Sequence, residues 1–185
     1  METIHVWTKQ HETVLKELEQ TGRYTAKKRY VQLENEDCSS IVLEAYDWLV
    51  AHTPNRTLRP ADAEYPVWVS LAQETTMLPE AGRVILELEI DRAILAPIHV
   101  RKWSMILNYS YIPSSPEDRE RHLKLLSDYR TNDATAYMSQ FYPAIKREIV
   151  SSWERLFDPA VEAECQYEYG IIWELKREWI VNVTR

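Results

Sequence analysis

The chain has 185 residues and a formal net charge of −7, with 28% charged and 45% hydrophobic residues. At this length folding buries about 70% of the surface of the unfolded chain, so the fold needs neither a disulfide nor a metal. The longest run of Lys and Arg has three residues, at 27–29, and no apolar run approaches the roughly 18–20 residues of a membrane span; duplex nucleic acid and membranes are therefore not expected partners.

The first half of the chain alternates strand and helix signals. In the first helix Val14, Leu15 and Leu18 fall on one face, and Gly22 is a natural stop. A second apolar stripe at helical spacing begins near residue 39, and two prolines then mark a loop. The predicted elements are a strand at 4–7, a helix at 10–21, a helix at 39–51 and a loop at 53–65.

The second half begins with strands and ends with strands. Val84 and Leu86 alternate with Ile85 and Glu87, which is the pattern of a strand with two different faces. Ser115 followed by Pro116 predicts a helix start. The predicted elements are strands at 66–71 and 83–90, a short helix at 99–108, helical chain from 115 to 158 with breaks near 132–133 and at 143, and strands at 167–175 and 179–183.

This order of elements predicts an α+β fold with mainly antiparallel sheet. The early and middle strands form the sheet, the segment at about 99–158 is largely helical, and the C-terminal strands return to pair with the middle ones. We expect one domain over residues 1–185; a domain with a helical insertion is the alternative. Cys38 and Cys165 lie far apart, and the first residues lack a signal-peptide pattern. We therefore expect a cytoplasmic protein with reduced thiols.

The motifs that identify common catalytic sites are absent from the sequence. Three glycines are too few for a glycine-rich phosphate loop, and there is no HExxH or GxSxG. The five histidines show no metal-binding spacing, so no metal is expected.

Several acidic residues lie in apolar strand contexts. Glu87 and Glu89 share the face opposite Leu86, and we favour a solvent-facing edge for them. Glu174 lies between two apolar residues; alternation predicts that it points outward, and the alternative is a desolvated catalytic acid. Glu168 lies between two tyrosines in a Q-x-E tripeptide. For this residue a structural role and a catalytic role have more nearly equal support, with the structural role slightly favoured.

Polar residues also lie at the end of the first strand. We favour Thr8 as the N-cap of the helix that follows. The alternative places Thr8 and Gln10 in a ligand site at the end of the strand.

Several segments together resemble the bacterial domain-of-unknown-function family DUF3841. The resemblance depends on the order of motifs over nearly the whole chain and implies no activity. The segments are 6–10 (VWTKQ), 45–49 (AYDWL), 65–68 (YPVW), 86–91 (LELEID), 103–108, 152–158 and 173–175 (WEL).

The chain is also distantly similar to the ADP-ribosyltransferase fold. The similarity lies in Thr8, Gln10, and the helical rhythm of Leu15, Leu18 and Gly22. It implies an NAD site and a carboxylate on a late strand that stabilises the oxocarbenium-like transition state as nicotinamide leaves.

The resemblance implies Glu168 or Glu174 as the catalytic residue, and Thr8, Gln10 and Trp68 as the cofactor-binding residues. The leading hypothesis is therefore an ADP-ribosyltransferase-like, NAD-binding enzyme. One alternative is a non-catalytic protein-interaction or regulatory module, with a protein as its partner. The other is an enzyme that acts on a nucleotide or nucleic acid, for which the only early basic cluster is Lys27, Lys28, Arg29, Arg56 and Arg59.

Overall fold

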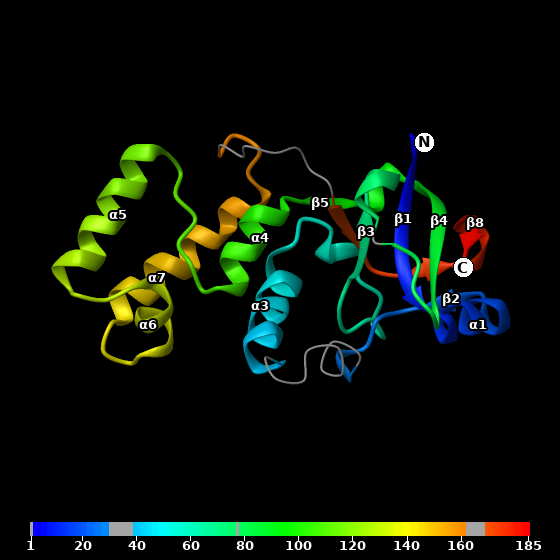
Figure 1. The fold of residues 1–185 in the computed structure, drawn as a ribbon, viewed down its shortest axis with the longest axis horizontal. Coiled ribbons are helices and arrows are strands. Elements are labelled where there is room, and N and C mark those ends of the chain that lie inside the picture. Colours follow the sequence, from blue (N-terminus) through cyan, green and yellow to red (C-terminus); the bar gives the residue numbers. More distant parts are fainter. Residues whose placement is uncertain (1, 30–38, 77, 162–168) are drawn as a thin grey trace. The chain divides into compact units, whose positions relative to one another are not determined.

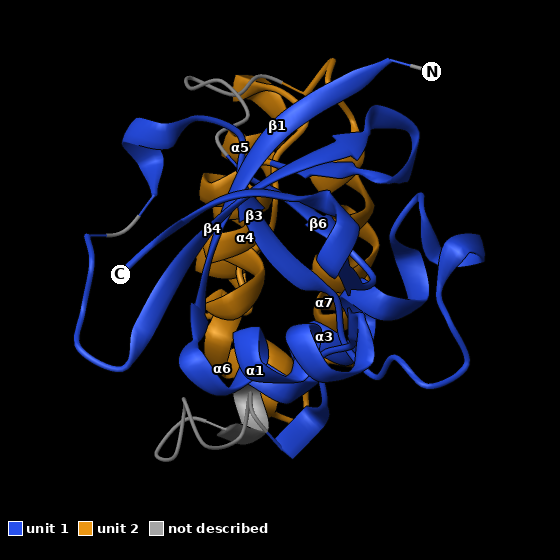
Figure 2. Cartoon of the chain, turned by 90° about the vertical axis from the view of Figure 1, so that its right-hand side faces the viewer, with its two compact units in different colours: residues 1–98, 167–185 blue, residues 99–166 orange. Residues whose placement is uncertain are grey.

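The computed structural model describes residues 2–29, 39–76, 78–161 and 169–185. Glu168, Cys38 and Cys165 lie outside these residues, so the predictions about them have no structural counterpart here. By its contacts the chain divides into two compact units, which Figure 2 distinguishes by colour. Unit 1 is Met1–Ile98 with Tyr167–Arg185, and unit 2 is His99–Gln166. The single-domain prediction stays a prediction, since a compact unit is not by itself an independent folding domain.

Unit 1 combines strands with the helices α1 and α3 in its described residues (Figure 1). Its strands and helices confirm an α+β protein. They are β1 (Thr3–His11), α1 (Glu12–Thr21), β2 (Arg23–Tyr24), α3 (Ser39–His52), β3 (Val67–Ser70), β4 (Arg83–Asp91), β5 (Ala96–Ile98), β6 (Tyr169–Ile172), β7 (Leu175–Lys176) and β8 (Ile180–Thr184).

The main sheet has six strands in the order β5-β6-β3-β1-β4-β8, and β2 pairs with β7 in a small second sheet. Every pairing in both sheets is antiparallel. β6 pairs with β3, and β8 pairs with β4. The predicted return of the C-terminal strands to the middle ones is thus confirmed.

The two faces of the main sheet differ in character. The core face of the sheet packs its apolar side chains with α1 in one buried cluster. Val6 and Leu86 belong to this cluster, as do Val67 and Val69 of β3. The opposite face, called here the outer face, carries Trp7 and Glu87 and is only partly buried over β1 and β4. The alternation predicted for β4 is confirmed, because its even-numbered residues from 84 to 90 are buried.

β1 is longer than its sequence suggests, and this overturns one prediction. The strand pairs with β4 without interruption from Thr3 to His11, so Thr8 lies inside the strand and is not a helix cap. The N-cap of α1 is His11, whose side chain accepts a hydrogen bond from the Thr13 backbone. The helix stops at Gly22 as predicted, where φ is +78°.

α3 packs beside the outer face at β3. Tyr46 meets the Trp68 ring edge-on, with centroids 6.4 Å apart. The Tyr65 hydroxyl donates a hydrogen bond of 2.7 Å to Asp47. These contacts hold α3 against the outer face at β3. The part of the outer face over β1, β4 and β8 is left uncovered by this helix.

Unit 2 is helical, and its boundaries follow the sequence signals. Ser115 caps α5 by accepting from the Asp118 backbone, with Pro116 in the first turn. The breaks near residue 132 and at Pro143 separate α5, α6 and α7 as predicted. The elements are α4 (Val100–Leu107), α5 (Pro116–Asp128), α6 (Asp133–Met138), α7 (Pro143–Ser152) and the 3-10 helix η5 (Trp153–Phe157). Across the described ranges of the chain, no helix combines the length and the apolar character needed to cross a membrane.

Candidate functional site

Of the three predicted cofactor-binding residues, Thr8 and Gln10 are hydrogen-bonded to each other, and Trp68 contacts Thr8 only through its backbone. The Thr8 hydroxyl donates to the Trp68 carbonyl over 2.8 Å, and Gln10 Nε2 donates to Thr8 Oγ1 over 2.7 Å. Thr8 is buried on the core face. The Trp68 ring points to the other face, since its neighbours Val67 and Val69 both lie in the core. The structure therefore joins Thr8 and Gln10 to the Trp68 backbone but not to its indole.

Glu174 lies in a cluster of charged side chains beside the small sheet. Its carboxylate accepts from Arg23 Nε, and Lys176 Nζ is 3.4 Å from its other oxygen. Arg23 also forms two hydrogen bonds of 3.0 Å with Asp62. Those bonds to Asp62, together with the bond to Glu174, raise the pKa of Arg23. The Glu174 carboxylate is thus already paired with a guanidinium, while its neighbours Trp173 and Leu175 are buried.

The early basic cluster is engaged in local contacts. Lys27 donates to the Asp62 carbonyl, and the Lys28 backbone donates to Glu64. Arg59 Nε donates to the Ala63 carbonyl, and its guanidinium lies 5.5 Å from the centre of the Trp173 ring. Lys27 and Arg59 thus donate to backbone carbonyls, which hold these side chains in place without neutralising their positive charges.

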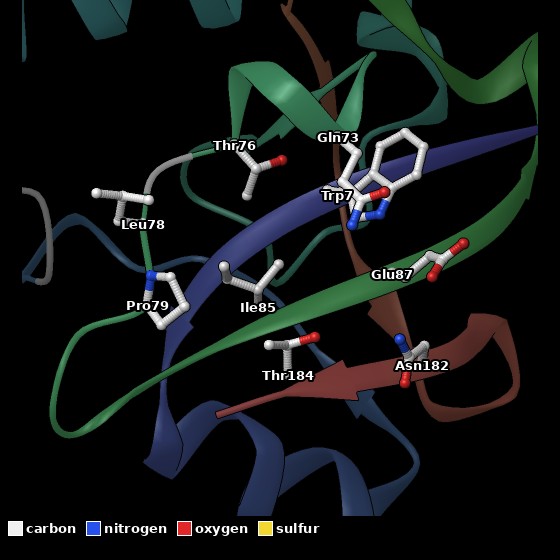
Figure 3. Close-up of a pocket in the computed structure, with 9 residues that line it drawn as sticks. All are labelled: Trp7, Gln73, Thr76, Leu78, Pro79, Ile85, Glu87, Asn182 and Thr184. Carbon is white, nitrogen blue, oxygen red and sulfur yellow. The ribbon is translucent and has the colours of Figure 1, made fainter.

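A pocket lies on the outer face, and the strand register explains why. Trp7 of β1 pairs with Glu87 of β4, and Glu87 pairs with Asn182 of β8, so the three side chains form one row across the sheet. A second row pairs Ile85 with Thr184. The segment between β3 and β4 supplies the rest of the rim, as Figure 3 shows. The lining residues are Trp7, Gln73, Thr76, Leu78, Pro79, Ile85, Glu87, Asn182 and Thr184.

Glu87 is the only charged residue of this lining. Its Oε1 lies 2.9 Å from Nδ1 of His5, and its side chain is 25% exposed. Within the described part of the chain, Oε2 has no hydrogen-bonding partner. Sequence reasoning placed Glu87 on the face opposite the core, which is correct, and favoured a plain solvent-facing edge. It missed the pocket, because the pairing of β4 with β8 cannot be read from either strand alone.

Unit 2 has a polar cluster centred on Asp118. The carboxylate accepts from the Tyr111 hydroxyl at 2.8 and 2.9 Å and from the Ser114 backbone at 2.9 Å. Arg121 and Arg155 lie 3.0 and 3.1 Å from it. Burial alone would raise the pKa of Asp118, but these hydrogen bonds outweigh it and hold the pKa far below its usual range. The cluster is largely satisfied within unit 2, and this favours a structural role.

His122 extends the same cluster. Its Nε2 is 2.7 Å from Asp133 and its Nδ1 is 3.1 Å from Glu148, while Tyr111 stacks on the ring at 3.9 Å. Because both ring nitrogens face carboxylate oxygens, the doubly protonated imidazolium fits this site best. Burial alone would lower the pKa of His122, but the hydrogen bonds and charges of Asp133 and Glu148 outweigh it and raise the pKa.

A stability measurement across pH tests this arrangement of His122. The stabilising contribution is complete below the unfolded-state pKa of about 6.5 and is lost as the pH rises through the higher folded-state pKa. We expect the free energy of unfolding to fall between slightly acidic and moderately alkaline pH, measured by urea titration. The His122→Gln variant, which cannot titrate, should lack this component. An identical slope in both proteins would contradict the prediction.

Fold and site together define an α+β protein with an antiparallel sheet and a pocket on its outer face. The chain belongs to the DUF3841 family, a domain of unknown function whose family model matches residues 5–181. Neither the curated proteins nor the solved structures include one that matches the chain. Among the described residues, no three His, Cys, Asp or Glu side chains are grouped to hold a metal ion.

Proposed function

We propose that the chain binds a small molecule in the outer-face pocket, and that this ligand is NAD. The row of Trp7, Glu87 and Asn182 carries the proposal, because it brings an aromatic ring, a carboxylate and an amide into one hollow. Ligand sites typically combine an apolar wall with a few convergent polar groups. Each of these three groups has a counterpart in the nicotinamide riboside end of NAD, namely the ring, the ribose hydroxyls and the carboxamide.

The size of the pocket limits how much of the ligand it holds. Its volume is about 220 Å³, below the roughly 300–1,000 Å³ of sites that enclose a drug-sized molecule. One ring with its sugar fits such a volume, and the remainder of a dinucleotide would extend over the open side. The adjoining surface would then contribute to affinity without enclosing the ligand.

The resemblance to ADP-ribosyltransferases supplies the reaction to be tested. In such a transfer the bond between the ribose C1′ and the nicotinamide nitrogen breaks, and nicotinamide leaves as a neutral molecule with the bonding electron pair. A nearby carboxylate stabilises the positive charge that develops on the ribose. An acceptor nucleophile, water in the simplest case, then forms the new bond and releases a proton. Glu87 is placed in the pocket, whereas Glu174 is paired with Arg23.

Calorimetric titration with NAD at neutral pH tests the proposal. We expect about one site per chain, and about tenfold weaker binding for Glu87→Gln, because a hydrogen bond to a charged group contributes on the order of 1.5–3 kcal/mol. Glu174→Gln is the matched variant and should bind as the parent does. Nicotinamide release, followed by chromatography, reports turnover.

Each result has a distinct meaning. Loss of binding in Glu174→Gln alone, with its circular dichroism unchanged, would move the site to the cluster of Glu174 and Arg23. Absence of heat for the unmodified protein up to millimolar NAD would reject NAD as the ligand.

A second candidate, protein interaction, is favoured by unit 2. Met138 and Phe141 are 66% and 81% exposed at the connection between α6 and α7, and Tyr129 is 57% exposed at the end of α5. Exposed large apolar side chains that gather on a surface commonly mark contact with another protein. This candidate gains weight if NAD does not bind.

A further inference from the structure

The charge of the pocket restricts its ligand more sharply than its shape does. Its nine lining residues include one carboxylate, Glu87, and no Lys, Arg or His. An anionic group inside the hollow would meet the negative charge of Glu87 and no compensating cation. A phosphate is therefore a poor occupant, whereas a positively charged group would neutralise the carboxylate.

Basic side chains lie around this lining but are not part of it. Arg83 and Arg185 line a neighbouring hollow that shares Pro79 with the pocket, and His5 and Lys9 lie on the outer face. Lys9 shares the outer face, but its Nζ is 2.8 Å from Glu80. His5 contacts the Glu87 carboxylate and is 51% exposed, so the pair leaves one carboxylate oxygen for a ligand. Glu89 pairs with His5 across the strands on the same face, but it lies outside the pocket lining.

Trp7 gives the site a second preference for cations. It is the direct cross-strand neighbour of Glu87, so its indole lies within reach of whatever the carboxylate binds. A cation over the face of a tryptophan ring is attracted by the ring quadrupole, and tryptophan is the best aromatic side chain for this contact. A planar cation satisfies both groups at once, since its ring stacks while its charge faces the carboxylate.

We propose that the outer-face pocket selects planar organic cations of the pyridinium type over neutral and anionic molecules of the same shape. This inference rests on the proposed function and refines it: the positively charged nicotinamide ring of NAD enters the pocket, and the pyrophosphate stays outside. The site is thus a cation site formed by Trp7 and Glu87, and not a phosphate site.

Three probes with almost the same ring test the proposal: 1-methylnicotinamide is a cation, nicotinamide is neutral and nicotinate is an anion. We expect 1-methylnicotinamide to bind about tenfold more tightly than nicotinamide, and nicotinate to bind most weakly. Titrations are followed by calorimetry on the full chain, with NAD measured in the same series.

Glu87→Gln should remove most of the preference for 1-methylnicotinamide over nicotinamide, with a smaller preference left from Trp7, and leave nicotinamide binding unchanged. Glu89→Gln is the matched control, because it removes the same charge from the same face of β4 at a position outside the pocket lining. Its preference for the cation should equal that of the parent.

The outcomes separate this inference from the proposed function. Binding of NAD without any preference for 1-methylnicotinamide overturns the cation site and leaves NAD binding intact. Glu87-dependent binding of 1-methylnicotinamide without NAD binding supports the cation site and rejects NAD. If no probe binds, both proposals are wrong.

Discussion

Replacing Trp153 with alanine is expected to lower the free energy of unfolding of the protein by about 3–5 kcal/mol, the usual cost of replacing a large buried aromatic side chain with alanine. Trp153 is 1% exposed. Its ring stacks on Tyr137 with centroids 5.4 Å apart, and its Nε1 donates to the Ser110 carbonyl over 3.0 Å. The variant therefore loses packing, a ring contact and a hydrogen bond together.

Urea unfolding followed by circular dichroism measures this effect. The Trp153→Phe variant separates the loss of packing from the loss of the hydrogen bond, since phenylalanine keeps a ring but cannot donate to Ser110. The loss of stability in this variant should be clearly smaller than in the alanine variant. A loss below 1 kcal/mol for the alanine variant would mean that Trp153 is not a core residue of unit 2.

Replacing Asp118 with asparagine is the second change with a large expected effect. It removes the negative charge that faces Arg121 and Arg155, both of which stay in place. The Asp118 side chain is only 15% exposed, whereas those of Arg121 and Arg155 are 52% and 28% exposed, so water screens the charges left unpaired. The loss of hydrogen bonds to the carboxylate should cost about 1.5–3 kcal/mol. We expect a loss of this order at neutral pH.

The pH dependence of this loss provides a further check. The folded-state pKa of Asp118 is depressed, so its contribution is present above the unfolded-state value of about 3.9 and is lost as the pH falls toward the folded-state pKa. The difference between parent and variant should shrink in acid. Asp128→Asn, an exposed acid at the end of the same helix, is the control and should change little. Equal losses for the two variants would contradict the special role of Asp118.

Local signals in the sequence predicted most of the elements of this fold. The alternation of residues 84–90 identified β4, and Ser115 with Pro116 identified the start of α5. Gly22 was correctly expected to end the first helix. Each of these signals acts over a few neighbouring residues, through side-chain alternation or backbone conformation, and so is visible in the sequence alone.

The site depends on contacts between distant residues, which the sequence does not display. β1 continues past Thr8 because β4 pairs with it along its whole length, and this pairing overrides the capping preference of threonine. The pocket forms because Trp7, Glu87 and Asn182 come into register across three strands. Glu174 finds Arg23 through the pairing of β2 with β7. In each case the strand register, and not the residue itself, decides the role.

The insertion of unit 2 between β5 and β6 has a consequence for folding kinetics. Ile98 and Tyr169 are paired neighbours in the sheet, although all of unit 2 separates them along the chain. Closing so long a loop from an unfolded chain costs entropy before the strands gain their hydrogen bonds. If unit 2 collapses first, the loop becomes effectively shorter, and the strands meet sooner. Early helix formation in unit 2 would then set the rate at which β5 pairs with β6 at the edge of the sheet.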